Sequence, residues 1–320
     1  AYWTEHLPSD LAPFIGTPLC ILRAMYGYTY SCKLLYEEQA EFLLQFGFTS
    51  SVLPAVWFKH LPNNGILIIL QYCDDLLCAS TSPKALLHFK TMLAKRFSIQ
   101  WEPRAHWYLQ ACIDSDSHGN ITLDQTRYAS AIVRHYLPNS DPTPSAQDLI
   151  TYESPLPRDF KWSKSDSSSN HDAVCALDLR YQFCYCEAVG SLIYLSNTVV
   201  EELFAIRKAC KYMHLPGQSH YDALLNLMHH LRCHPPKALK YYVNPMVSPL
   251  ATLPRNAGHS ELDPTFVWFS DSSWAHCDDS CSTGCHTGFL QGDPINFSSF
   301  VHLPVQQLSA EAESMSLQCH

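Results

Sequence analysis

Residues 65–79 read GILIILQYCDDLLCA, and this stretch is the most informative part of the chain. Two adjacent carboxylates, Asp74 and Asp75, stand between two short apolar runs. Apolar runs rich in Ile and Leu, opened here by Asn63-Asn64-Gly65, are typical of buried strands. A hairpin of two such strands brings both carboxylates to one point. This suits a divalent-metal site of the kind used in phosphoryl transfer, but a solvated Asp-Asp turn fits the spacing equally well.

Length and composition set broad limits on the fold. The chain has 320 residues, 47% of them hydrophobic, which is enough for two or three compact units. Its 14 cysteines are scattered, which indicates a reducing compartment rather than a disulfide framework. No apolar run approaches the roughly 20 residues of a membrane span, so no membrane partner is expected. The net charge of −9 is unusual for a nucleic-acid enzyme.

The pattern of apolar residues predicts a mixed chain of helices and strands. A helix is expected over 33–46, and a second helix begins at Ser82-Pro83, where Ser is a suitable cap. A short strand and a helix follow over 121–136. Residues 138–172 are rich in Pro and Ser and predict a linker or surface loop. Further helices are expected over 187–196, 201–213 and 219–233. Short strands are expected over 266–270, 286–290 and 295–299, before a helix that starts at Ser309.

Several sequence words, in a fixed order, resemble those of copia-type retrotransposon polymerases. Tyr72-Cys73-Asp74-Asp75 resembles the Tyr-x-Asp-Asp box of reverse transcriptases. The other matching words span nearly the whole chain: Ala24-Met25-Tyr26-Gly27, residues 41–48, residues 189–196, Ser270-Asp271-Ser272-Ser273-Trp274-Ala275, Ser282-Thr283-Gly284 and residues 308–313. A single box carries little weight, whereas an ordered series identifies the chain as a member of this family.

The resemblance implies an α+β fold in several parts. A reverse-transcriptase fingers and palm region with a mainly antiparallel sheet is expected over 1–137, without its N-terminal part. A linker over 138–180, a helical thumb or connection over 181–243 and a truncated ribonuclease H-like α/β unit over 262–320 follow. The implied function is RNA-directed DNA polymerase with a ribonuclease H region, in a retroelement particle in the cytoplasm or in the nucleus. The implied partners are an RNA template, a DNA primer, an RNA–DNA hybrid and deoxynucleoside triphosphates.

The resemblance also assigns site residues. Asp74 and Asp75 are expected to be catalytic and to hold Mg²⁺, or Mn²⁺ in its place, with Tyr72 at the primer end. The basic side chains of one helix are expected to contact phosphates: Lys84, Lys90, Lys95 and Arg96. In the ribonuclease H region Asp271 and Glu313 are the expected catalytic metal ligands. Glu311 is the alternative to Glu313. Side chains two positions apart on a helix point about 200° from each other, so both cannot face Asp271.

Some expected parts are missing or altered. The family's third palm carboxylate precedes the segment that matches residues 2–8, and its last ribonuclease H acid lies beyond His320. Thr29-Tyr30, Cys32 and Leu35 replace the Lys-Gln, Pro and Trp of the family. The sequence therefore predicts a fragment or decayed copy with incomplete catalytic sites. The alternative is a co-opted, non-catalytic nucleic-acid-binding protein.

Two groups of His and Cys residues are candidates for zinc sites. One runs from His276 to His286, and the other comprises His229, His230, Cys233 and His234. The first lacks the C-x2-C pair of structural zinc sites and the second has no evident second half, so zinc is not expected at either.

Overall fold

The computed structural model describes residues 30–157, 163–243, 266–273, 282–290, 293–302 and 309. The chain divides into two compact units, residues 1–105 and 106–320. The division between the two units lies between residues 105 and 106, whereas the sequence predicts a boundary at residue 137. Residues 106–137 therefore belong to the second unit. Mixed helices and antiparallel sheets make up both units, as expected for an α+β fold.

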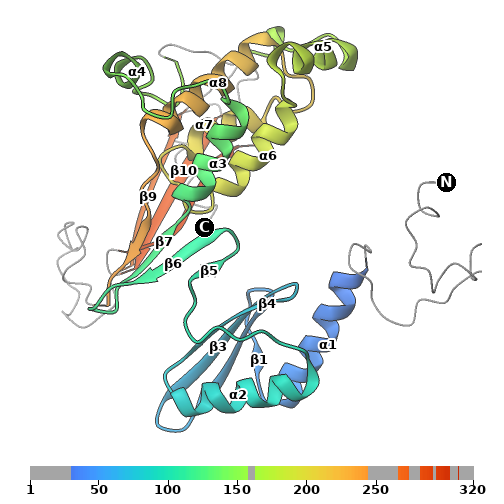
Figure 1. Ribbon diagram of the computed structural model, residues 1–320, viewed down its shortest axis with the longest axis vertical. Coiled ribbons are helices and arrows are strands. Elements are labelled where there is room, and N and C mark those ends of the chain that lie inside the picture. Colours follow the sequence, from blue (N-terminus) through green and yellow to red (C-terminus); the bar gives the residue numbers. More distant parts are fainter. Residues whose placement is uncertain are drawn as a thin grey trace, which may run out of the picture. The chain divides into compact units, whose positions relative to one another are not determined.

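The first unit is built on a four-stranded antiparallel sheet in the order β1-β2-β3-β4 (Figure 1). Its strands are β1 (Thr49–Ser50), β2 (Val56–Leu61), β3 (Gly65–Tyr72) and β4 (Asp75–Ser80). Asn63 and Asn64 turn the chain between β2 and β3 with φ of 59° and 57°. Asn tolerates this left-handed conformation better than most residues, which explains a turn at this point.

Two helices cover one face of this sheet: α1 (Ser31–Gln45) and α2 (Pro83–Arg96). The cap at α2 is as predicted, because the Ser82 side chain accepts a hydrogen bond from the backbone N–H of Ala85. The core between helices and sheet contains Leu43, Phe48, Trp57, Leu67, Ile69, Phe89 and Leu93. Aromatic rings dominate its centre, where Phe42, Phe46 and Phe89 contact one another. The opposite face of the sheet carries the alternate side chains of β3.

The second unit starts with another antiparallel sheet, in the order β5-β6-β7-β8. Its strands are β5 (Trp107–Tyr108), β6 (Ala111–Ser115), β7 (Ile121–Asp124) and β8 (Leu239–Tyr241). Strand β8 pairs with β7 although more than a hundred residues separate them in the sequence. This long-range pairing explains why residues from 106 onward belong to the second unit.

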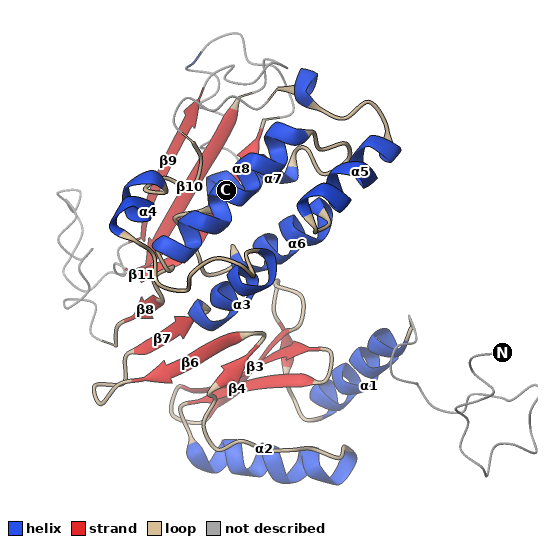
Figure 2. Ribbon diagram, turned by 45° about the horizontal axis from the view of Figure 1, so that its top comes forward, coloured by secondary structure: helices blue, strands red, loops and turns tan. Residues whose placement is uncertain are grey.

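Four helices that follow β7 and precede β8 in the sequence lie together in the second unit (Figure 2), and their buried side chains form the larger of two apolar clusters among the described residues. The four helices are α3 (Thr126–Tyr136), α6 (Tyr185–Leu195), α7 (Leu203–Cys210) and α8 (Gln218–Cys233). These helices confirm the predicted segments. Tyr185, Leu192, Tyr221 and Leu224 are almost completely buried at the centre.

The range predicted as a linker contains regular structure. Helix α4 (Ala146–Thr151), the 3-10 turn η2 (Lys164–Asp166) and helix α5 (His171–Tyr181) lie within it. Helix α4 has a capping box, in which Ser145 and Asp148 each accept a hydrogen bond from the other's backbone N–H. The linker prediction was wrong here. It rested on Pro and Ser content, whereas Ser145 and Asp148 form a capping box that favours a helix.

A third antiparallel sheet has the order β11-β10-β9. Its strands are β9 (Phe266–Ser273), β10 (Thr283–Leu290) and β11 (Asp293–Val301), and they confirm the three predicted strands. Helix α7 and strand β8 both contact β11, so this sheet belongs to the second unit. None of the helices in the described ranges has the length and apolar character needed to cross a bilayer.

Candidate metal-binding hairpin

The two adjacent carboxylates lie at the tip of the β3–β4 hairpin. Tyr72 pairs with Asp75 across the hairpin, so Cys73 and Asp74 alone form the turn. Asp74 and Asp75 are both exposed, and Tyr72 is 54% exposed. The tip thus presents both carboxylates to solvent, and the cost of burying them does not arise.

Cys73 takes a strained position in the turn. Its φ is 49°, in the left-handed region that disfavours residues with a Cβ. The thiol of Cys32, in the first turn of α1, is the main reason why the pKa of Cys73 is raised. Burial and the charges of Asp74 and Asp75 raise this pKa further. The start of α1 therefore lies beside the carboxylate turn.

A buried glutamine holds the base of the same hairpin. Gln71 is 4% exposed, and its Oε1 accepts a 2.9 Å hydrogen bond from Trp57 Nε1 on β2. Its Nε2 donates to Gln39 Oε1 at 2.7 Å and to the Tyr36 carbonyl at 3.5 Å, both on α1. The Gln71 amide thus accepts one hydrogen bond through its oxygen and donates two through its nitrogen. This network was not predicted from the sequence, where its signal is a polar residue directly after an aliphatic run.

The chemistry of the tip suits a hard cation. Carboxylate oxygens are the ligands that Mg²⁺ prefers, and Mg²⁺ is commonly held by one or two carboxylates together with substrate phosphates and water. Within the described ranges no group of three or more His, Cys, Asp or Glu side chains is placed to hold a metal ion. Asp74 and Asp75 therefore fit a partial ligand set that a substrate would complete.

The predicted phosphate-contacting residues lie on the helix side of the sheet. Arg96 forms an ion pair with Glu38 of α1 at 2.9 Å, and Lys90 lies over the ring of Trp101. Lys84 and Lys95 are exposed on α2. Because Gln71 points toward α1, the next residue, Tyr72, and its partner Asp75 project toward the opposite face. The structure does not bring the basic side chains of α2 together with Tyr72 and Asp75.

The second carboxylate set is described only in part. Asp271 is exposed on β9, opposite Cys285 of β10, and its Oδ1 accepts a hydrogen bond from the Ser272 N–H. Burial and the charge of Asp271 raise the pKa of Cys285. Glu311 and Glu313 lie outside the described residues, as do His276, Cys277 and Cys281 of the first candidate zinc group.

The second candidate zinc group has other partners. His229 stacks on Tyr152 with ring centroids 4.5 Å apart, and His230 contacts Glu202 at 3.2 Å. Cys233 is buried. These side chains therefore have partners within the second unit.

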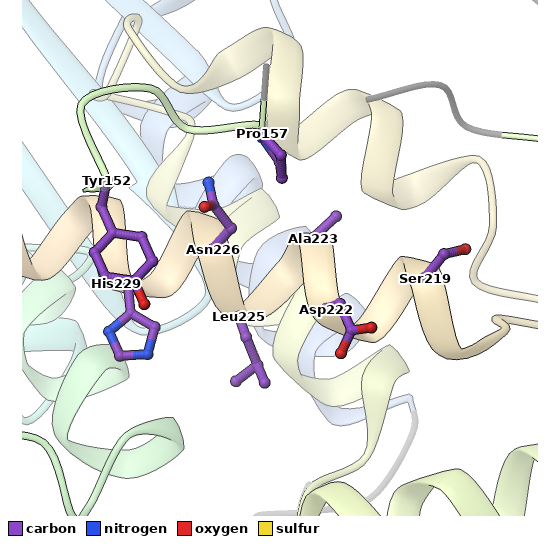
Figure 3. Close-up of a pocket in the computed structure, with 8 residues that line it drawn as sticks. All are labelled: Tyr152, Pro157, Ser219, Asp222, Ala223, Leu225, Asn226 and His229. Atoms are coloured by element: carbon purple, nitrogen blue, oxygen red, sulfur yellow. The ribbon is translucent and has the colours of Figure 1, made fainter. Parts of the chain in front are cut away.

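A pocket of about 420 Å³ opens beside α8, lined by Tyr152, Pro157, Ser219, Asp222, Ala223, Leu225, Asn226 and His229 (Figure 3). Asn226 donates from its amide to the carbonyls of Ser154 and Pro155, which closes one side. The Asp222 carboxylate accepts a 2.6 Å hydrogen bond from the Tyr181 hydroxyl. None of the predicted site residues lines this pocket.

Comparison with known proteins supports the reading of the hairpin. Residues 19–143, which contain the whole β3–β4 hairpin, match the family model "Reverse transcriptase (RNA-dependent DNA polymerase)". The retrovirus-related Pol polyprotein from transposon RE2 of Arabidopsis thaliana is 26% identical over 301 residues, which is 93% of this chain. These similarities support the resemblance of the chain to part of a copia-type retrotransposon Pol polyprotein.

Other relatives show how much of a Pol polyprotein this chain spans. It covers only 18% of the RE2 polyprotein and 13% of the one from transposon TNT 1-94 of Nicotiana tabacum, which is 23% identical over 182 residues. An uncharacterized mitochondrial protein of Arabidopsis thaliana is 25% identical over 253 residues, which is 78% of this chain and 90% of that protein. No solved structure matches the chain.

Proposed function

We propose that this chain supplies the metal-binding hairpin of an RNA-directed DNA polymerase that copies an RNA template from a DNA primer. One observation carries the proposal: the tight turn between Tyr72 and Asp75 presents Asp74 and Asp75 together and exposed, within the part that matches the reverse-transcriptase family.

Each residue of the tip has a proposed role. Asp74 and Asp75 hold Mg²⁺ or Mn²⁺, which neutralises triphosphate charge and aligns the primer hydroxyl when it is bound. Tyr72, more than half exposed and on the same face as Asp75, contacts the primer end. Lys84 and Lys95 contact phosphates away from the tip, because α2 covers the other face of the sheet. Lys90 and Arg96 have protein partners and hold α2 in place.

The third sheet has a separate proposed role in ribonuclease H chemistry. Asp271, exposed on β9, is the first metal ligand, and Glu313 or Glu311 is the second. In this scheme the first unit corresponds to a palm, α6 to α8 to a thumb or connection, and β9 to β11 to a ribonuclease H-like unit. The substrate is an RNA–DNA hybrid in a retroelement particle or in the nucleus.

Metal binding provides the first test. Mn²⁺ titration of the intact chain, followed by electron paramagnetic resonance, should show a site that depends on the hairpin carboxylates. Asp74→Asn and Asp75→Asn should each weaken it by about tenfold or more. Glu41→Gln, an exposed charge removed from α1, is the matched control and should leave binding unchanged. Equal Mn²⁺ affinity in all four proteins would contradict the proposal.

Primer extension on an RNA template provides the second test. Extension that requires Mg²⁺ and disappears in Asp74→Asn supports polymerase activity in this chain. The alternative function is nucleic-acid binding without catalysis. It is indicated if extension is absent while affinity for an RNA–DNA hybrid falls steeply with salt and survives Asp75→Ala.

A further inference from the structure

Strand β3 contains an aliphatic run that makes both of its faces apolar. Residues 66–70 are all Ile or Leu. Leu67 and Ile69 are almost fully buried under the helices, whereas Ile66, Ile68 and Leu70 lie on the other face. A strand with alternating polar and apolar residues is held to one orientation by its pattern, because a slip by one residue exposes the apolar set. This run lacks that protection.

The partner strand β4 has the same ambiguity. Leu76 and Cys78 pack against the core under the helices, and Leu77 and Ala79 alternate with them on the other face. Both faces of β4 are again apolar. The whole β3–β4 hairpin could therefore turn over with little change in apolar burial. Asp75, which pairs with Tyr72, would then project to the helix side.

Gln71 breaks this symmetry. Its side chain meets Trp57 on β2 and both Gln39 and Tyr36 on α1, and its backbone N–H donates to the Ala55 carbonyl at 2.9 Å. In a turned-over hairpin Gln71 would face away from these groups. The indole N–H of Trp57 and the amide of Gln39, which are 4% and 7% exposed residues, would lose their partner inside the core. Such loss disfavours the turned-over form by about tenfold or more.

We propose that Gln71 is a positioning residue that decides which face of the sheet the β3–β4 hairpin presents. A single buried polar group fixes register in the same way at the interface of some coiled coils. Gln71 acts on the carboxylates through strand geometry. When Gln71 lies on the helix side of the sheet, Tyr72 and Asp75 project from the opposite face. The consequence for metal binding rests on the proposed function, whereas the orientation of the hairpin does not.

The native Cys78 thiol reports the orientation. It lies on the helix side, and burial raises its pKa to about 12, so maleimide should modify it slowly in the wild-type protein. Gln71→Met keeps the length of the side chain and removes its hydrogen bonds. Modification of Cys78, measured by mass spectrometry of its peptide, should become about tenfold faster or more. The rate should not depend on low denaturant concentrations, because the hairpin turns over within the folded protein.

Two further variants separate positioning from simple loss of stability. Ile69→Ala weakens the same strand and leaves the Gln71 hydrogen bonds in place, so its Cys78 modification should rise steeply with denaturant, as global unfolding requires. Gln71→Glu keeps the acceptor for Trp57 Nε1 but loses the donors to Gln39 and Tyr36, so its modification rate should lie between those of the wild type and Gln71→Met. Unchanged protection of Cys78 in Gln71→Met would overturn the proposal. A denaturant dependence equal to that of Ile69→Ala would also overturn it.

Mn²⁺ titration of the same proteins connects orientation to the metal site. Gln71→Met should lose about tenfold or more in Mn²⁺ affinity, and Gln71→Glu should recover part of it. If the wild-type chain binds no Mn²⁺ while Cys78 responds as described, the proposed function fails and the role of Gln71 in orientation stands.

Discussion

Glu202 Oε1 lies 3.2 Å from Nε2 of His230, and the two side chains are only 3% and 10% exposed. His230 also contacts the carbonyl of Tyr152 through Nδ1 at 2.7 Å. Burial lowers the pKa of His230, but the hydrogen bonds to Glu202 and Tyr152 and the charges of Glu202 and Glu201 outweigh it, so the pKa is raised. The pair links α8 to the segment before α7.

This pair predicts a stability term with a definite pH dependence. Because the pKa of His230 is higher in the folded state, its contribution is complete below its ordinary value of 6.5 and is lost as pH rises through the folded value. His230→Gln should cost about 3 kcal/mol at the acid side, as for other broken buried pairs, and less at high pH. Amide hydrogen exchange of α8 at several pH values measures this difference.

The stability of the wild type must be compared with that of His230→Gln at each pH. Burial lowers the pKa values of His220 and His229, so their contributions to stability change with pH in the opposite direction to that of His230. A difference between wild type and His230→Gln that stays constant from pH 5 to 9 would contradict this role of the pair.

Two glycines in the second unit predict opposite effects of the same substitution. A Cβ at Gly217, the cap of α8, would lie 1.6 Å from the backbone oxygen of Asp166, whereas a Cβ at Gly190 in α6 meets nothing within 4 Å. Gly217→Ala should therefore separate η2 from α8 and lower the melting temperature. Gly190→Ala should stabilise its helix by about 1 kcal/mol. Thermal unfolding of both variants by circular dichroism measures the effects; equal melting temperatures would be inconsistent with this close contact.

Strain at Cys73 predicts that glycine is better tolerated in the carboxylate turn. With φ at 49°, Cys73→Gly should stabilise the hairpin by up to about 1 kcal/mol, because glycine adopts this conformation freely. Cys73→Ala keeps the strain and is the matched control. Hydrogen exchange of β3 and β4 amides gives the measurement, and identical protection in both variants would argue against strain at this position.

Removal of the Ser145 cap is expected to destabilise α4 locally. Ser145→Ala removes the hydrogen bond to the Asp148 N–H and should cost α4 about 1 kcal/mol. Faster exchange should be confined to α4 amides. Ser163→Ala, which removes the cap of η2 instead, should leave α4 unchanged. Equal exchange of α4 in both variants would show that the ion pair between Arg232 and Asp148, at 3.2 Å, holds the helix without its cap.

Local sequence was sufficient to predict the hairpin and most helices. Asp74 and Asp75 interrupt two apolar runs, and such an interruption can only lie at a turn if the runs are buried strands. Ser82-Pro83 marks the start of α2 because both residues satisfy the unpaired first turn of a helix. Helices α6, α7 and α8 of the second unit follow from their apolar periodicity. These signals arise between residues a few positions apart, so they can be read directly.

Long-range contacts decided the rest. The pairing of β7 with β8 set the division at residue 105, and no local pattern connects Leu123 with Leu239. The orientation of the carboxylate hairpin is a second case. Its strands are apolar on both faces, so their sequence permits either orientation. The hydrogen bonds that Gln71 accepts from Trp57 and donates to Gln39 become available only when α1 and β2 have packed beside β3. The candidate site residues were therefore predicted from the sequence alone, whereas the face of the sheet on which they lie depends on the completed core.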